Sequence, residues 1–144
     1  MKLTTRLLIL LAAMSSASIS SVAWAEIAVI ANTANPEASL TVAQAKKIFL
    51  GKRTSFPGGS WAEPVDQAEG SATRDAFYQK AAHKDAAQMK AYWSKMIFSG
   101  KATPPEIVGD DAAVKAWVAG NKDGIGYIDS SAVDGSVKVL LTLP

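Results

Sequence analysis

Two kinds of hydrophobic pattern alternate along the chain. Short runs of apolar and β-branched residues predict strands at residues 26–31, 64–67, 106–108, 124–128 and 137–141. Apolar residues that recur every three or four positions predict helices that start near Thr41, Ser71, Asp85 and Asp110. Because strands and helices alternate, the pattern predicts the α/β class: a single, three-layer-like domain with a mainly parallel central sheet.

Local signals mark several helix boundaries and core positions. Thr41 followed by Gln44 is typical of a capping box, and Gly51 is typical of a helix stop. The helix that starts at Asp85 is expected to bury four residues at helical spacing, namely Met89, Trp93, Met96 and Ile97. Trp61 follows a Pro-Gly-Gly turn; we expect it in the core, with an exposed contact surface as the alternative.

The first residues have the layout of a secretory signal peptide. Lys2 and Arg6 precede an unbroken apolar run at residues 7–13, and Ala23-Trp24-Ala25 is a small-x-small cleavage sequence. A membrane anchor, the alternative, needs about 18 apolar residues. We therefore predict cleavage after Ala25, a periplasmic location, and a working domain at residues 26–144 that is not stably inserted in the membrane.

Charge and composition exclude several classes of function. Lys2 and Arg6 are two of 15 basic residues, so the predicted domain has 13 basic and 13 acidic residues. A neutral domain without a basic run does not predict nucleic-acid binding. With no Cys and a single His, His83, the chain offers no ligand set for a transition metal and predicts no cofactor. No nucleophile, base and orienting group are arranged for catalysis, so we expect no enzyme.

The clearest candidate for chemistry is the segment at residues 66–74. A predicted strand ends there, Gly70 allows a turn, and hydroxyl residues Ser71 and Thr73 open a helix. The first N–H groups of a helix have no internal partner and lie at the positive end of its dipole, so they bind anions readily. Arg74 would add positive charge. The alternative is plain capping by Ser71 with Arg74 solvated.

Four stretches in order resemble the phosphate-binding proteins of phosphate ABC importers. They are residues 47–52 (KIFLGK), Trp61, residues 70–73 (GSAT) followed by Phe77, and residues 124–128 (GIGYI). These are similar to the family's IF-x-G-K helix end, its G-S-G-T anion loop and its A-I-G-Y strand.

The resemblance implies a type-2 periplasmic binding protein fold and a site for phosphate or a related oxyanion. Its implied ligand-binding residues are Gln67, Gly70, Ser71, Ala72, Thr73 and Arg74. Two positions differ from the family pattern: Gln67 stands where the family has Arg, and Ala72 where it has the second Gly. Gln67 donates hydrogen bonds but carries no charge, and we expect it to help orient the ligand.

The chain is shorter than the two-lobed members and resembles one lobe, mostly the second. Asn32 and Thr33 follow the first predicted strand, and they are candidates for substitute donors. If that strand is parallel to the strand at 64–67, both loops lie at the same edge of the sheet, where ligands of open α/β sheets bind. The alternative for Asn32 and Thr33 is a simple Asx turn.

The sequence thus predicts a periplasmic solute-binding protein that holds phosphate or a related oxyanion at a helix N-terminus. An ABC permease or another envelope protein is the expected partner, and a second copy of the chain or a partner would cover the exposed ligand. The alternative function is an accessory or interaction module of the envelope that does not serve transport and has lost tight anion binding.

Overall fold

The computed structural model describes residues 25–144. Except for Ala25, the predicted signal peptide lies outside the described residues. No helix of the described part is long and apolar enough to cross a membrane. The elements in chain order are β1 (Ile27–Ala31), α1 (Val42–Phe49), β2 (Glu63–Gln67), α2 (Ala72–Ala82), α3 (Ala86–Phe98), β3 (Glu106–Gly109), α4 (Asp111–Gly120), β4 (Gly124–Asp129), the 3₁₀ turn η1 (Ser130–Ala132) and β5 (Lys138–Leu143).

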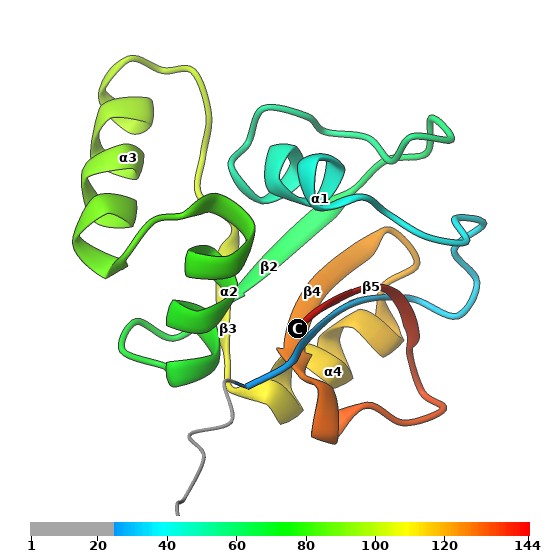
Figure 1. The fold of residues 1–144 in the computed structure, drawn as a ribbon. Helices are drawn as coiled ribbons and strands as arrows, with labels where there is room; N and C mark the ends of the chain where they lie inside the picture. Colours follow the sequence, from blue (N-terminus) through cyan, green and yellow to red (C-terminus); the bar gives the residue numbers. More distant parts are fainter. Residues whose placement is uncertain (1–24) are drawn as a thin grey trace, which may run out of the picture.

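The five strands form one sheet in the order β3-β2-β4-β1-β5 (Figure 1). β2 is parallel to both β3 and β4, whereas β1 is antiparallel to both β4 and β5. Four of the five strands therefore run in one direction and β1 runs against them. This confirms the predicted α/β fold with a mainly parallel sheet.

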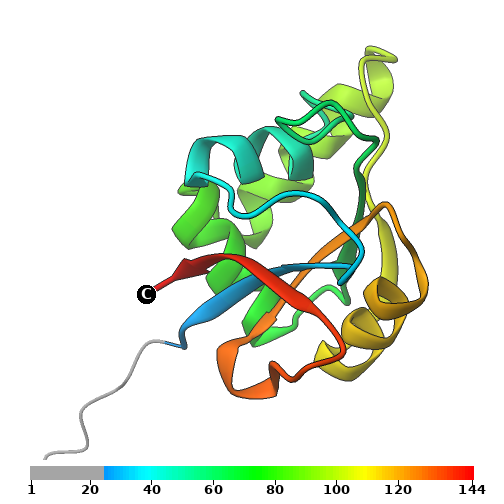
Figure 2. The same ribbon diagram turned by 90° about the vertical axis from the view of Figure 1, so that its right-hand side faces the viewer.

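Helices cover both faces of the sheet, as Figure 2 shows. Ile27 and Val29 of β1 pack into a core formed largely with α1, α2 and α3, whereas Ala28 and Ile30 pack against α4. Successive residues of a strand point to opposite faces. A strand that is buried on both sides therefore needs an unbroken apolar run, which is what residues 27–31 provide.

The helix starts lie where the sequence predicts them. Thr41 and Gln44 form a capping box at α1, and Asp85 and Gln88 form another at α3. Ser71 caps α2, and Asp110 caps α4. Each cap supplies an acceptor to a backbone N–H of the first turn that has no partner inside the helix. These short-range bonds fix where each helix begins.

Two aromatic and apolar residues expected in the core are exposed. Trp61 is 58% exposed and forms a short isolated bridge with Ser55 in the segment between α1 and β2. Ile97 is 56% exposed, whereas Met89 and Trp93 of the same helix are buried. The prediction of burial was wrong for both residues. For Ile97, helical spacing defines a stripe but not how far the neighbouring elements extend along it.

Candidate functional site

The candidate site is built where β2 leaves the sheet. β2 ends at Gln67, the chain turns through Gly70, and α2 begins at Ala72. Gly70 has φ +85°, and a Cβ there would meet no atom within 4 Å. Glycine is thus favoured by the backbone conformation and not by crowding. The Ser71 N–H donates to the Ala68 carbonyl at 3.1 Å and closes the turn.

The start of α2 presents several hydrogen-bond donors without acceptors. Within residues 25–144, the backbone N–H groups of Gly70, Ala72 and Thr73 have no acceptor, and neither does the Thr73 hydroxyl. Gly70 and Ala72 are exposed, and Thr73 is half-buried. These groups lie at the positive end of the helix dipole, so an anion would satisfy them.

The Ser71 hydroxyl, in contrast, is engaged inside the protein. Its Oγ accepts from the Arg74 N–H at 3.2 Å and donates to Oε1 of Gln67 at 2.8 Å. Gln67 is 1% exposed, and its Nε2 donates to Oδ1 of Asp111 at 2.6 Å and to the Tyr127 carbonyl at 3.0 Å. Gln67 therefore lies behind the loop and positions Ser71 and α4, rather than projecting toward solvent.

Arg74 lies against the end of the sheet, with its side chain 12% exposed. Nη1 donates to the Gln67 carbonyl at 2.9 Å, and Nη2 lies 3.8 Å from Oδ2 of Asp66. The guanidinium carbon is 5.7 Å from the centre of the Tyr78 ring. The positive charge is thus fixed beside the helix start, but the Asp66 carboxylate faces it.

Asp66 is a buried carboxylate that the sequence pattern does not single out. It is 2% exposed, accepts from the Gln67 N–H at 2.9 Å and from the Tyr78 hydroxyl at 2.7 Å, and also accepts from the Tyr127 hydroxyl. Burial, together with the nearby Asp66, raises the pKa of both Tyr78 and Tyr127. Both tyrosines therefore remain neutral donors that satisfy the carboxylate.

The network is not signalled by the strand itself, because β2 has the mostly polar sequence EPVDQ and is buried only at its end. A carboxylate buried there must find donors, and Tyr78 and Tyr127 supply them. Tyr78 lies 12 residues from Asp66 along the chain, and Tyr127 lies 61 residues from it. Neither separation is visible in a local pattern.

Asn32 and Thr33 do not join this site. Ala31 lies opposite Ile125 in β4, and Ile125 lies opposite Pro64 near the start of β2, so β1 ends beside the beginning of β2. The prediction that the two loops share an edge was wrong, because β1 is antiparallel to β4 and therefore also runs opposite to β2.

The loop after β1 forms the simple Asx turn that was the alternative. Oδ1 of Asn32 accepts from the Ala34 N–H at 2.9 Å. Nδ2 of Asn32 donates to the carbonyls of Val118 at 2.9 Å and Ala119 at 3.0 Å, at the C-terminal end of α4. Thr33 is exposed.

Other charged groups near α2 limit what the site can hold. Glu69 and Asp75 flank the helix start and are exposed. In the part of the chain that the structure describes, no three His, Cys, Asp or Glu side chains gather where they could hold a metal ion. The arrangement of donors suits an anion bound by backbone N–H groups.

Three solved structures share this fold. A putative phosphate ABC transporter substrate-binding protein with bound phosphate from Clostridium perfringens is 32% identical, with a TM-score of 0.64. An ABC-type phosphate transport receptor from Vibrio cholerae is 23% identical (TM-score 0.63), and a possible phosphate binding protein from Planctomyces limnophilus is 19% identical (TM-score 0.55). No protein-family model matches the chain, and neither does any curated protein.

Each of the three alignments covers 81% of this chain, but only 45%, 47% and 42% of the respective solved chains. The chain thus spans less than half the length of the proteins that it matches. Figure 1 shows a single sheet with helices on its two faces, the architecture of one lobe. The described domain therefore resembles one lobe of the substrate-binding proteins of phosphate ABC transporters.

Proposed function

We propose that the protein is a solute-binding protein that captures phosphate or a related oxyanion at the N-terminus of α2. The observation that carries the proposal is the set of unpaired backbone N–H groups at Gly70, Ala72 and Thr73 within the described chain. They lie in the loop that resembles the family's anion loop, and the similar protein from Clostridium perfringens was solved with bound phosphate.

The physical case rests on the helix end and on the position of Arg74. Three N–H groups and the positive end of the α2 dipole stabilise an anion without any side-chain rearrangement. Asp66 offsets part of the Arg74 charge, and Glu69 and Asp75 repel a dianion. An exposed site of this kind binds weakly, so a second copy of the chain or a partner protein would have to cover the ligand for tight capture.

The proposed location follows from the same resemblance and from the predicted signal peptide. The protein would be exported to the periplasm after cleavage behind Ala25 and would deliver its ligand to an ABC permease or to another envelope protein. The alternative, an accessory module without transport, is favoured by the uncharged Gln67 in the family's Arg position and by the missing second lobe. The similarity to three phosphate-binding or phosphate-transport proteins speaks against it.

A proline substitution tests the site without disturbing the fold. Ala72 is the first residue of α2, where proline is well tolerated, and Ser71 before it has ψ 129°, which a following proline accepts. Ala72→Pro removes one N–H donor and places a ring at the helix start. Isothermal titration with phosphate should show affinity at least about tenfold weaker, since a hydrogen bond to a charged group is lost.

The matched control is Val42→Pro at the first position of α1. Thr41 before it has ψ 161°, and the exposed helix start lies outside the α2 loop. This variant should bind phosphate as the unmodified protein does, with a similar melting temperature. No heat and no melting shift at millimolar phosphate in the unmodified protein, or equal affinity in Ala72→Pro, would refute the proposed site.

A further inference from the structure

A groove of about 490 Å³ extends from the candidate site along α3. The residues of α3 that line it lie on one stripe, namely Ala86, Ala87, Lys90, Trp93, Ser94 and Ile97. From Ala86 to Ile97 the helix rises about 16 Å. The opposite wall is formed by the end of β2, the first turn of α2, and the segment that leads into β3.

The two ends of the groove differ in chemistry. Gly70 and Arg74 line the end next to α2, together with the carboxylates of Asp66, Glu69 and Asp75. The groove therefore reaches the proposed anion site at Gly70, whereas Ala72 and Thr73 do not line it. Its remaining walls are largely apolar and include Ile97, Pro105 and Ile107. Ile97 and Ile107 are 56% and 50% exposed, an arrangement that leaves apolar surface open to water.

Trp93 contributes a second, independent feature. The side chain lines the groove and is 6% exposed, yet its Nε1 has no hydrogen-bond partner within residues 25–144. The far edge of its six-membered ring packs against Gly51. A Cβ atom built on Gly51 would lie 3.2 Å from Cη2 of Trp93. Nε1 belongs to the five-membered ring at the other end of the indole. Buried indole N–H groups usually find an acceptor, but this one is shielded from solvent, so Trp93 forms an apolar part of the groove wall.

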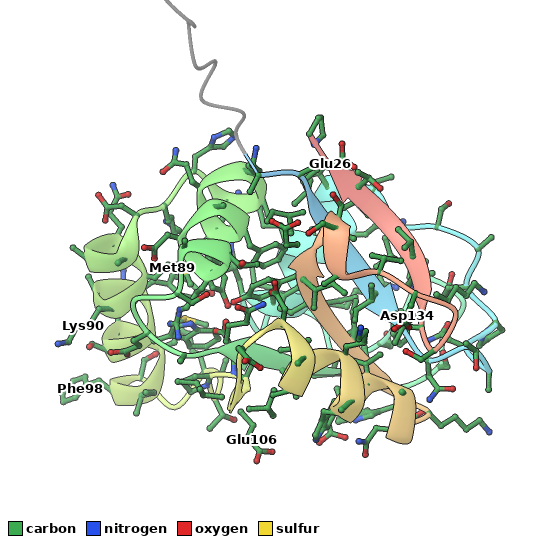
Figure 3. The ribbon with its side chains drawn as sticks, turned by 90° about the horizontal axis from the view of Figure 1, so that it is seen from below. Glu26, Met89, Lys90, Phe98, Glu106 and Asp134 are labelled. Carbon is green, nitrogen blue, oxygen red and sulfur yellow. The ribbon has the colours of Figure 1, made fainter. Side chains whose placement is uncertain are left out.

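The charged side chains around the groove limit the ligand further. Lys90 borders it, but Figure 3 shows its side chain extending away from the body of the domain, as does that of Phe98. Glu69 and Asp75 line the α2 side and disfavour a second negative group. A ligand in the groove should therefore be uncharged beyond its anionic head.

We propose that the ligand is a phosphate monoester with an uncharged, largely apolar organic substituent. This inference rests on the proposed function, because the phosphate group would occupy the N–H groups at the start of α2. The substituent would lie along α3 against Ile97 and Ile107, over the buried Trp93 side chain. A volume of this size is typical of sites for organic ligands and is much larger than inorganic phosphate needs.

Calorimetric titrations with three probes separate this inference from the proposed function. Inorganic phosphate tests the anion site alone, phenyl phosphate tests the site together with the groove, and phenol tests the groove alone. We expect phenyl phosphate to bind about tenfold tighter than phosphate, as burial of a ring predicts, and phenol to bind more weakly than either.

A pair of neighbouring residues provides the variant and its control. Ile97→Gln should lower the affinity for phenyl phosphate to that for phosphate, with phosphate binding unchanged. Phe98→Gln is the matched control, because Phe98 is 96% exposed on the same helix and does not line the groove. It should leave both affinities as they are.

The outcomes distinguish the two proposals. Equal affinities for phosphate and phenyl phosphate would overturn the inference and leave the phosphate site standing. Phenol that binds as tightly as phenyl phosphate would overturn it too, since the groove would then act without the anion site. No binding of either phosphate compound would overturn the proposed function and the inference together.

Discussion

The loop after β1 and the loop after β2 look alike in the sequence, since each follows a buried strand and carries small polar residues. In the structure, Asn32 after β1 turns its amide inward and donates to the last carbonyls of α4. The loop after β2 turns the Ser71 hydroxyl inward to Gln67, but it leaves the backbone N–H groups of Gly70, Ala72 and Thr73 without acceptors in the described chain.

The difference arises from the chemistry of the helix end beside each strand. β1 ends beside the C-terminus of α4, where carbonyl groups require donors, and an Asn amide supplies them. β2 ends in a glycine turn that opens a helix, where N–H groups require acceptors. Similar polar residues therefore have a purely structural role at one end of the sheet and border a candidate anion site at the other.

Removing Asp66 should have the largest effect, because the network behind the β2 loop depends on it. Asp66→Ala leaves two buried tyrosine hydroxyls without their acceptor and removes the carboxylate that faces the Arg74 guanidinium. We expect a loss of about 3–5 kcal/mol in the free energy of unfolding, measured by urea denaturation. A loss below about 1 kcal/mol would mean that the loop is held in place without this carboxylate.

Alkaline pH should weaken the same region through its tyrosines. Burial raises the pKa of Tyr78 and Tyr127 in the folded state above the ordinary value of 10.0. Above pH 10 the unfolded chain releases these protons while the folded chain retains them, so stability is full below pH 10 and falls as the pH rises. At pH 11 each tyrosine accounts for a loss of roughly 1 kcal/mol.

Tyr127→Phe isolates this contribution. The free energy of unfolding of the variant should fall less between pH 10 and pH 11 than that of the unmodified protein, by about 1 kcal/mol. Denaturation curves at pH 9, 10 and 11 measure the slopes. Parallel slopes for the two proteins would contradict the assignment of the raised pKa to Tyr127.

Asn32 should matter for stability and not for binding. Asn32→Ala removes two donors from the α4 carbonyls and the acceptor for the Ala34 N–H, so we expect a loss of about 1–3 kcal/mol. Asn32→Asp keeps the shape but places a carboxylate against carbonyls at the negative end of α4, and it should lose at least as much. If either variant, still folded by circular dichroism, bound phosphate more weakly, the separation of the two loops would be wrong.

The sequence predicted the parts of this fold that depend on neighbouring residues. The caps at Thr41, Ser71 and Asp85 are signalled within three or four positions, and all three begin helices. The reversal of β1 is not signalled locally, because its apolar run fits either direction in a sheet with two covered faces. The placement of Asn32 failed for this reason.

Within the site, the turn and the helix start were predictable, but the roles of the side chains were not. Gln67 binds Asp111 from 44 residues away, and Asp66 binds Tyr127 from 61 residues away. Such pairs depend on which strands become neighbours. The exposure of Ile97 likewise depends on which elements pack against α3, since Met89 and Trp93 of the same helix are buried.

The smallest expected effects come from a matched pair of threonines, one in each loop. Thr33 is exposed, and Thr73 is half-buried beside the unpaired N–H groups of α2. Neither hydroxyl has a hydrogen-bond partner within residues 25–144, so Thr33→Ala and Thr73→Ala should each change the free energy of unfolding by less than about 0.5 kcal/mol. In binding they should differ.

The Thr73 hydroxyl can donate to an anion at the start of α2, so Thr73→Ala should weaken phosphate binding by roughly fivefold to tenfold. Thr33→Ala should leave phosphate affinity unchanged, because its loop lies at the opposite edge of the sheet. Titration of both variants under identical conditions gives the comparison directly. Equal weakening in both would place the ligand elsewhere, whereas an effect confined to Thr73 would assign binding to the loop after β2, whose backbone donors lack acceptors in the described chain.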